Sequence, residues 1–467
     1  MVRGEVGPAA GGRHGGALRG TRPAAGHLHR RPRGAAFGRV TDAATTLAAL
    51  RRGDLAGTRE LRLAGLGLRE FPPEILGLAG SLELLDLSGN ALGALPPGLA
   101  RCRRLRVFFG SGNRFGRLPP VLGDCPALSQ VGCRGSALAE VPAEALPPGL
   151  RWLTLTDNQL AALPPALGER PALQKLMLSG NRLQQLPAGL AGAGRLELLR
   201  IAANRFEALP PWLAGLPRLA WLAMAGNPCE GEGLVPAAPA AAWSALAPGA
   251  LLGEGASGRV HAARWAGRPV ALKLFKGAMT SDGLPEREMA ACLAAGTHPH
   301  LVGALGRLEG HPEALQGLVM PLLPPDWRVL AGPPSLESCS RDVYDPALRL
   351  APPVALRIAR GIGAAAAHLH GQGLLHGDLY AHNVLWDGAA GAAVLSDLGA
   401  AAFLPPGPMG ATLQRLEVRA WGLLLGELLD RCEAAVPEAA RAVERACVQP
   451  AVAARPLLAE AVAMLPA

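Results

Sequence analysis

Residues 173–187 read Leu-Gln-Lys-Leu-Met-Leu-Ser-Gly-Asn-Arg-Leu-Gln-Gln-Leu-Pro, one copy of the frame L-x-x-L-x-L-x-x-N-x-L-x-x-L-P. The frame recurs from residue 61 onward in constant register, with almost equal steps between successive copies. Its Asn position is filled in turn by Leu66, Asn90, Asn113, Ser136, Asn158, Asn181, Asn204 and Asn227. A fixed period of this length predicts stacked units, each of which buries its apolar face against its neighbours.

This pattern resembles a leucine-rich repeat solenoid over about residues 55–230. The resemblance implies one short strand per repeat on a concave wall, with the leucines pointing inward. A short amide side chain suits the Asn position, because it can bond backbone groups of the turn that no ladder reaches. Leu66 and Ser136 cannot supply the full set of amide bonds. The run from Asp42 to Leu55 is expected to form a helical cap.

Function on such a solenoid is expected on the outward strand positions of the concave wall. Apolar side chains are unusually frequent there, and Trp152, Trp221, Phe109 and Met177 are the candidate residues for binding a protein partner. The alternative is that neighbouring strands, about 4.8 Å apart, let these side chains cover one another.

The second half holds a different series of motifs. The chain has only three lysines, and Lys273 ends the stretch Val270-Ala271-Leu272-Lys273. Before it lies a G-x-G-x-x-G-x-V loop at 253–260, and after it come His-Gly-Asp-Leu-Tyr-Ala-His-Asn at 376–383 and Asp-Leu-Gly at 397–399. In this order and spacing the four motifs resemble a protein kinase domain.

The kinase resemblance implies ATP and Mg²⁺ as ligands. Backbone N–H groups of the glycine loop would approach the phosphates, which a Cβ on its glycines would obstruct. Lys273 would contact the α- and β-phosphates, held by Glu288 on the following helix, with Glu286 as the alternative. The expected nucleotide-binding residues are Gly253, Gly255, Gly258, Val260, Lys273 and, in the strand leading to the hinge beside the adenine, Met320.

The catalytic acid–base chemistry is expected at the catalytic loop. By resemblance, Asp378 orients the acceptor hydroxyl and accepts its proton. Asn383 and Asp397 match the two metal ligands, and hard oxygen donors of this kind suit Mg²⁺.

Several positions depart from the usual kinase pattern. Gly377 replaces an Arg that normally grips a phosphate on the activation loop, which predicts a site ordered without such a phosphate. Tyr380 stands where serine/threonine kinases usually carry Lys near the γ-phosphate, which removes one cation from the site. The segment between Asp397 and Glu417, taken as the start of a helix, is short for a kinase, and no Ala-Pro-Glu is visible in it. Arg455 is expected to pair with Glu417 or Glu427 instead.

Composition excludes some classes of partner. The net charge of +9 rests largely on eight Arg within residues 1–45, so nucleic-acid binding by the folded part is not expected. The uncharged stretch 233–253 is rich in Ala and Pro, which favours a linker over a membrane span. The eight cysteines form no C-x-x-C pair, which fits buried thiols in a reducing, cytoplasmic compartment.

Together these observations predict an α/β leucine-rich repeat solenoid followed by a bilobal α+β protein kinase fold. The expected parts are a disordered Arg/Gly/Ala-rich tail at 1–45, the repeat domain at 46–230, an Ala/Pro linker at 231–248 and the kinase domain at 249–467. The expected function is ATP-dependent phosphorylation of protein hydroxyls, most often Ser or Thr, with a protein ligand on the concave repeat face. The alternative is an ATP-binding pseudokinase scaffold that binds proteins through its repeats.

Overall fold

A computed structural model describes residues 42–466 except 234, 256, 278 and 281. Residues Ala43–Ala467 form one compact unit, to which the description below is confined. The tail expected over 1–45 lies outside the described residues up to 41, and its last residues already belong to helix α1.

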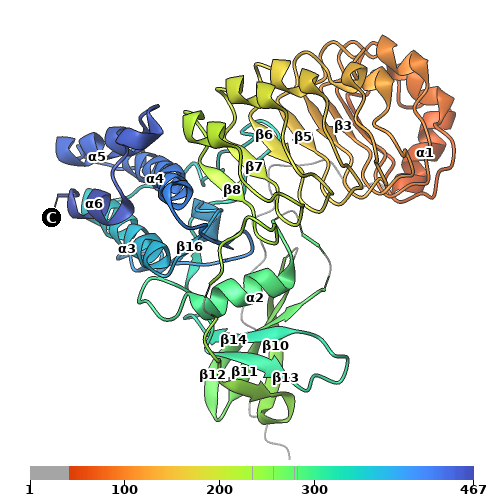
Figure 1. Cartoon of the computed structure of the whole chain (residues 1–467). Coiled ribbons are helices and arrows are strands. Elements are labelled where there is room, and N and C mark those ends of the chain that lie inside the picture. The colour runs from red at the N-terminus through yellow and green to blue at the C-terminus, as the bar shows by residue number, and fades with distance from the viewer. Residues whose placement is uncertain (1–41, 234, 256, 278, 281, 467) are drawn as a thin grey trace, which may run out of the picture. The chain divides into compact units, whose positions relative to one another are not determined.

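The first half is an eight-stranded parallel sheet in chain order, capped by α1 (Ala43–Arg51) at its first strand (Figure 1). A short 3-10 turn follows each of the first seven strands on the return path, usually with Pro at its start, where a missing N–H is harmless. The strands are β1 (Glu60–Arg62), β2 (Leu84–Asp86), β3 (Val107–Phe109), β4 (Gln130–Gly132), β5 (Trp152–Thr154), β6 (Lys175–Met177), β7 (Leu198–Arg200) and β8 (Trp221–Ala223).

Buried asparagines join successive repeats, as the sequence predicts. Asn181 accepts from the Leu160 N–H at 3.0 Å and donates to the carbonyls of Leu155 and Leu178 at 2.9 and 2.8 Å. Ser136 donates to the Gly110 carbonyl at 3.0 Å, so its shorter side chain makes only part of this network.

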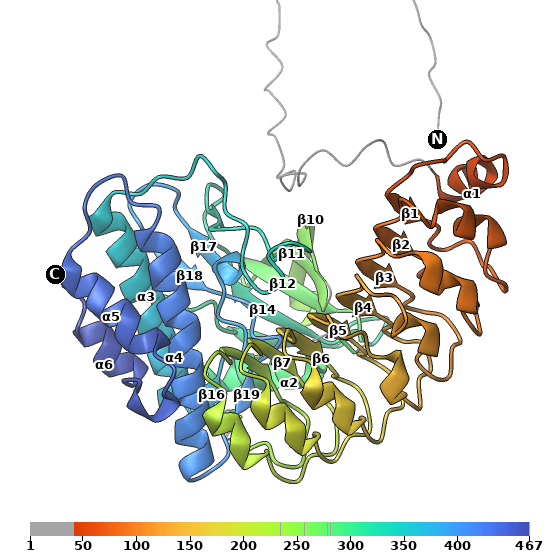
Figure 2. The same ribbon diagram turned by 90° about the horizontal axis from the view of Figure 1, so that it is seen from above.

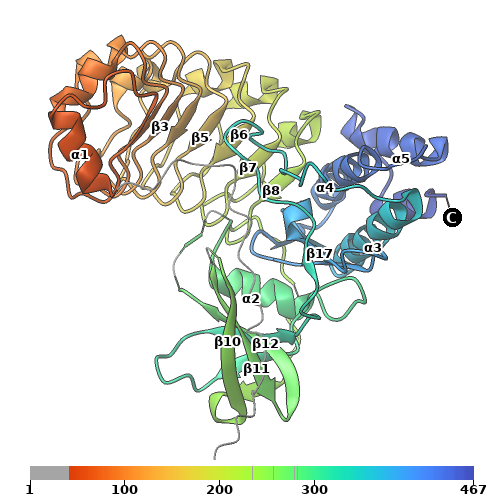
Figure 3. The same ribbon diagram turned by 180° about the vertical axis from the view of Figure 1, so that it is seen from behind.

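The second half begins with a small lobe around a six-stranded sheet of order β10-β11-β12-β14-β13-β9 (Figure 3). Helix α2 (Pro285–Ala294) follows β12. The strands are β9 (Ala240–Ala242), β10 (Leu246–Glu254), β11 (Gly258–Trp265), β12 (Arg268–Phe275), β13 (Gly306–Glu309) and β14 (Gly317–Pro321). The linker expected over 231–248 is therefore wrong in part, since β9 pairs in parallel with β13 at the sheet edge.

The large lobe that follows is mainly helical. Its helices are α3 (Pro352–Gly371), α4 (Pro408–Leu429), α5 (Glu438–Val448) and α6 (Leu458–Ala463). Its short strands are β15 (Arg328–Val329), β16 (Leu374–Leu375), β17 (Val384–Trp386), β18 (Ala393–Leu395) and β19 (Ala402–Phe403). Helix α4 begins at Pro408, so the expectation that Glu417 opens this helix is wrong, and the segment after Asp397 is even shorter than the sequence suggested.

The two halves share their cores. Leu375, Ala402, Leu413 and Leu416 of the large lobe belong to the same buried cluster as the leucines of the repeats. Conversely, Trp221 of β8 packs within the core of the large lobe. Figure 2 shows β7 close to β16 and β19, and helix α4 contacts both β8 and β16. The last repeats and the large lobe are thus built around continuous apolar contacts.

Candidate functional site

The small lobe contributes an ion pair between a strand and a helix. Lys273 lies in β12, and its Nζ pairs with Oε1 of Glu288 on α2, while Glu286 on the same helix is exposed. Burial alone would lower the pKa of Lys273, but the carboxylates of Glu288 and Asp397 outweigh it and raise that pKa. Lys273 is therefore charged, and its ammonium is held by Glu288.

The glycine loop joins β10 to β11 and borders a cavity of about 150 Å³. A Cβ on Gly258 would lie 2.4 Å from the Leu274 carbonyl oxygen, so packing alone requires glycine there. A Cβ on Gly253 or Gly255 would meet nothing within 4 Å, which leaves their backbone open to a ligand. The cavity is lined by Gly255, Ser257, Gly258, Val260, Lys273, Thr280, Asp282, Asp397 and Gly399. Gly253 and Met320 are not among these lining residues; Met320 pairs with Ala271 in the sheet.

The loop after β16 carries Asp378 and Asn383. The Asn383 Nδ2 donates to the Asp378 carbonyl at 2.8 Å and to its Oδ2 at 2.9 Å, which leaves the amide oxygen of Asn383 available as a ligand. His382 donates its backbone N–H to Asp342 at 2.9 Å, and its Nδ1 lies 2.7 Å from the same carboxylate. Burial lowers the pKa of His382, but the hydrogen bond to Asp342 and the charge of Asp378 outweigh it and raise the pKa.

The carboxylate of Glu417 binds the backbone at the start of this loop. Its carboxylate accepts from the N–H of Gly377 at 2.6 Å and of His376 at 3.2 Å, and lies 2.8 Å from His370 Nε2. Burial raises the pKa of Glu417, but these bonds, led by that to His370, outweigh it and hold the pKa below its usual range. The expected pairing of Arg455 with Glu417 or Glu427 is wrong: Arg455 donates to three backbone carbonyls instead.

Asp397 is the last of the candidate site residues along the chain. Its backbone adopts φ +61°, a left-handed conformation that is uncommon outside glycine, and its Oδ1 accepts from the Gly399 N–H at 3.1 Å. Among the described residues, no three His, Cys, Asp or Glu side chains gather closely enough to hold a metal on their own. A metal held by Asn383 and Asp397 would therefore need phosphate and water oxygens to complete its shell.

Comparisons with known families agree with this arrangement. Residues 246–405 match the protein tyrosine and serine/threonine kinase family, and residues 148–206 and 81–102 match leucine-rich repeat families. The chain is a leucine-rich repeat protein fused to a protein kinase domain. None of the helices that the structure describes is long and apolar enough to cross a membrane.

Individual relatives of this repeat–kinase fusion match only parts of it. Vasorin of Xenopus tropicalis is 51% identical over 47 residues, which is 10% of this chain and 7% of vasorin. A leucine-rich repeat protein of Leptospira interrogans matches with 23% identity and a TM-score of 0.35, over 39% of this chain and 52% of the other. The chain thus spans a small part of vasorin and about half of the Leptospira protein.

The repeat domain of the fusion contacts the loop at residues 376–383 of the kinase domain, which the sequence did not predict. Trp221, expected on an exposed wall, is 2% exposed and stacks on Tyr380 with ring centroids 4.1 Å apart. Arg200, at another outward strand position, forms an ion pair with Asp378. In the sequence, Arg200 differs from most outward wall residues only by its charge, which does not indicate a partner in the second half.

The other predicted wall residues of the repeat domain lie on earlier strands. Trp152 is half-buried, donates its Nε1–H to the Thr154 hydroxyl at 2.8 Å, and has the Lys175 ammonium 4.0 Å from its ring. Phe109 and Met177 are also half-buried. A Cβ on Gly132 would lie 2.8 Å from the ring of Phe109, so this ring covers its neighbouring strand.

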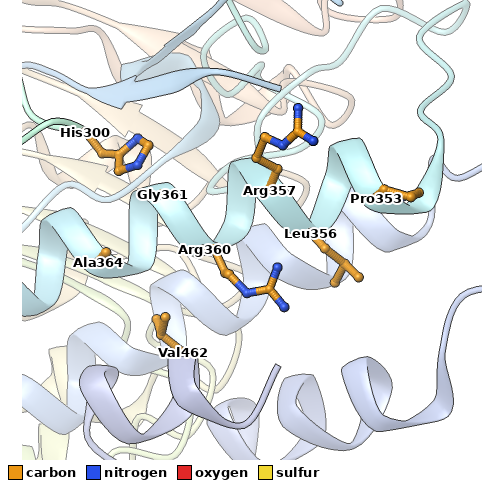
Figure 4. Close-up of a pocket in the computed structure, with 8 residues that line it drawn as sticks. All are labelled: His300, Pro353, Leu356, Arg357, Arg360, Gly361, Ala364 and Val462. Carbon is orange, nitrogen blue, oxygen red and sulfur yellow. The ribbon is translucent and has the colours of Figure 1, made fainter. Parts of the chain in front are cut away.

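A second cavity in the kinase domain, of about 450 Å³, lies along α3 away from these motifs (Figure 4). Arg357 and Arg360 line it, but Arg357 donates to the Ala390 carbonyl at 2.5 Å and Arg360 to the Pro466 carbonyl. His300 lies with its Nδ1 2.8 Å from the Ala393 carbonyl. The polar side chains of this cavity are therefore already engaged by backbone carbonyls of the kinase domain.

Proposed function

We propose that this protein is an ATP- and Mg²⁺-dependent kinase that transfers the γ-phosphoryl group to protein hydroxyls, Ser or Thr in the first place, without an activation-loop phosphate. The proposal rests above all on one observation. Lys273, which forms a buried ion pair with Glu288, lines the same cavity as Asp397 and the glycine loop.

Each side chain has a separate task in this proposal. Lys273 would hold the phosphates, and its pairing with Glu288 fixes the direction of its ammonium. The Asn383 amide oxygen and the Asp397 carboxylate would hold Mg²⁺, which supplies neutralisation of phosphate charge when bound. Asp378 would orient the acceptor hydroxyl and take its proton. Its position is set by Asn383 and by Glu417, which anchors the preceding residues.

Phosphate transfer from radiolabelled Mg-ATP tests this assignment. The full chain, Lys273→Met and Asp378→Asn would each be incubated alone and with a generic protein acceptor. We expect label in the wild type and a loss of at least about 100-fold in each variant, because each removes a charge that acts on the reacting groups. Unchanged labelling in both variants would sink the assignment.

Helix α2 offers a matched pair of variants. Glu288→Gln removes the buried partner of Lys273, whereas Glu286→Gln changes an exposed carboxylate on the same helix. We expect only Glu288→Gln to weaken ATP binding and transfer. Equal effects of the two substitutions on ATP affinity, measured by a thermal shift with Mg-ATP, would count against the role of the ion pair.

One observation favours the alternative of an ATP-binding scaffold. Both carboxylate oxygens of Asp378 are engaged, one by Arg200 and the other by Asn383. If Mg-ATP raises the melting temperature but neither the wild type nor any acceptor becomes labelled, the scaffold becomes the working function. The label in the experiment above therefore decides between enzyme and scaffold.

The proposed protein ligand belongs on the first strands of the concave wall. Hydrogen bonds and ion pairs from the repeats to the second half, among the described residues, begin at Gln130, whose Nε2 donates to the Leu336 carbonyl at 2.7 Å. Phe109 on β3 precedes that point, and Trp152 and Met177 stay within the proposal as half-buried neighbours. A cytoplasmic location is also part of the proposal, supported by eight cysteines that are all unpaired.

A further inference from the structure

Arg200 connects the repeat domain to the catalytic aspartate. It ends strand β7 and is 3% exposed. Its Nη1 donates to the Gly377 carbonyl at 2.9 Å, its Nη2 pairs with Oδ1 of Asp378, and its Nε lies 3.1 Å from Oδ1 of Asp282. Asp282 lines the cavity beside the glycine loop. One guanidinium thus holds the catalytic loop and a wall of the proposed nucleotide site together.

The contact with the repeat domain explains why Gly377 replaces the Arg that kinases usually have in the catalytic loop. Gly377 has φ +75°, which L-residues rarely adopt. A Cβ there would lie 2.5 Å from the Ala400 carbonyl oxygen and 2.7 Å from the Leu222 carbonyl oxygen of β8. An Arg at this position would displace the repeat domain. Glycine is therefore required for the repeat strand to lie against the loop.

The same contact explains why Tyr380 replaces the Lys that serine/threonine kinases usually have in this loop. Tyr380 occupies the position where the kinase resemblance calls for a cation, and its ring lies parallel to Trp221 with 7° between the planes. Trp221 also donates its Nε1–H to the Leu379 carbonyl at 2.9 Å. This loop position contributes to docking and carries no charge. The positive charge beside Asp378 comes from β7 instead.

The contact is a fixed part of the folded protein. Trp221 is a member of the large-lobe core, and large-lobe residues are members of the repeat core. Buried arginines add further links, because Arg455 donates to the Pro217 carbonyl at 2.8 Å and Arg419 to the Arg218 carbonyl at 3.2 Å. An interface with this continuous apolar packing does not open like a polar interdomain contact. We therefore expect Arg200 to remain beside Asp378 in the folded protein.

The charges at the contact are compatible with a working base. Arg200 pairs with Oδ1 of Asp378 and so places a positive charge beside this carboxylate. Each carboxylate oxygen has two acceptor sites, and the bonds from Arg200 and Asn383 use one on each oxygen. Asp378 thus keeps acceptor capacity for a substrate hydroxyl.

We propose that Arg200 is a positioning residue of the phosphotransfer site, supplied by the repeat domain in place of the cation that the catalytic loop lacks. This inference rests on the kinase activity proposed above. It makes the repeat domain a structural part of the active site. Arg200 acts through Asp378, by fixing its carboxylate between β7 and Asn383.

Steady-state kinetics of the full chain test the inference. Arg200→Gln keeps a hydrogen-bond donor for the Gly377 carbonyl but removes the charge, and Arg200→Lys keeps the charge. We expect Arg200→Gln to lower kcat about 100-fold, as removal of a preorganised electrostatic group does. Arg200→Lys should recover about tenfold of that loss, with KM for ATP within about threefold of wild type in both.

Arg419→Gln is the matched control, because it removes another buried guanidinium at the same interface that touches no catalytic group. It should lower the melting temperature by a similar amount and leave kcat unchanged. If Arg419→Gln lowers kcat as much as Arg200→Gln, the role of Arg200 is only structural. If Arg200→Gln raises kcat, Arg200 inhibits phosphate transfer in the wild type. Either result overturns the proposal.

Failure of the wider function is recognised separately. A wild-type chain without transfer rejects the proposed kinase activity and this inference with it, whereas an active wild type with an equally active Arg200→Gln rejects only the inference. If Arg200→Gln does not fold, Arg200→Lys decides alone. The Lys side chain cannot bind both the Gly377 carbonyl and Asp378 as the guanidinium does, so this variant should have a kcat about tenfold below wild type. Wild-type kcat in a folded Arg200→Lys protein would overturn the proposal.

Discussion

Glu427 of helix α4 has a pKa that lies in the neutral range. Its carboxylate accepts from the Tyr344 hydroxyl at 2.9 Å, and burial together with the nearby Asp342 raises its pKa to about 7. The carboxylate of Asp342 in turn contacts His382 of the loop at residues 376–383. A protonated Glu427 therefore spares this region a second buried negative charge.

The pH dependence of stability follows from that shift. Because the folded pKa of Glu427 lies above its unfolded value, the folded state binds the extra proton, and stability falls as pH rises from about 4.5 through about 7. Glu427→Gln should remove this fall, which amounts to at most about 3 kcal/mol. Urea unfolding at pH 5 and pH 8 measures it, with the exposed Glu433→Gln as control. Parallel pH profiles for wild type and Glu427→Gln would refute the shift.

At the scale of elements, the asparagine network predicts unequal costs for equivalent positions. Asn181 makes three bonds of 2.8 to 3.0 Å to two repeats, whereas Ser136 in the same register makes its best donated bond at 3.0 Å to one carbonyl. We expect Asn181→Ala to lower the free energy of unfolding by about 2–4 kcal/mol and Ser136→Ala by about 1 kcal/mol. Chemical denaturation of the two variants checks this, and equal losses would contradict it.

The elements that the sequence predicted correctly are mainly those with a periodic or motif-based pattern. The repeat frame predicted the strands and their asparagine bonds, because both recur with the same short period. The kinase motifs likewise predicted Glu288 as the partner of Lys273, and Lys273 and Asp397 lie with Gly255 and Gly258 at one cavity. Gly253 and Met320, from the same prediction, do not line that cavity. Strand β9 was missed, since its alanines carry no strand pattern and its partner β13 comes much later in the chain, after β12 and α2. The early start of α4 had a local signal, a proline at the first helical position.

The contact between Arg200 and Asp378 had no such local signal. It depends on the docking of two elements separated by 178 residues, and neither repeat spacing nor motif order encodes that docking. Gly377 and Tyr380 stood out in the sequence only as departures from a resemblance. Their physical reasons are the Leu222 carbonyl and the Trp221 ring, which only the folded chain brings together.

For the whole molecule, the shared cores predict joint unfolding. Separation of the halves would expose Leu375, Leu413 and Leu416 on one side and Trp221 on the other. We expect the full chain to unfold in a single calorimetric transition, with calorimetric and van't Hoff enthalpies in agreement. Differential scanning calorimetry of the wild type tests this. Two resolved transitions would show that the repeat and kinase domains fold independently.

The docking of β7 and β8 gives the repeat array a fixed end and a variable end. Neighbouring strands are about 4.8 Å apart, so a repeat duplicated between β7 and β8 would carry Arg200 one strand away from Asp378. A repeat duplicated between α1 and β3 would leave both residues in place, because the described polar contacts to the second half begin at Gln130. We therefore expect that a repeat can be added or removed near the α1 end without displacing Arg200 from Asp378.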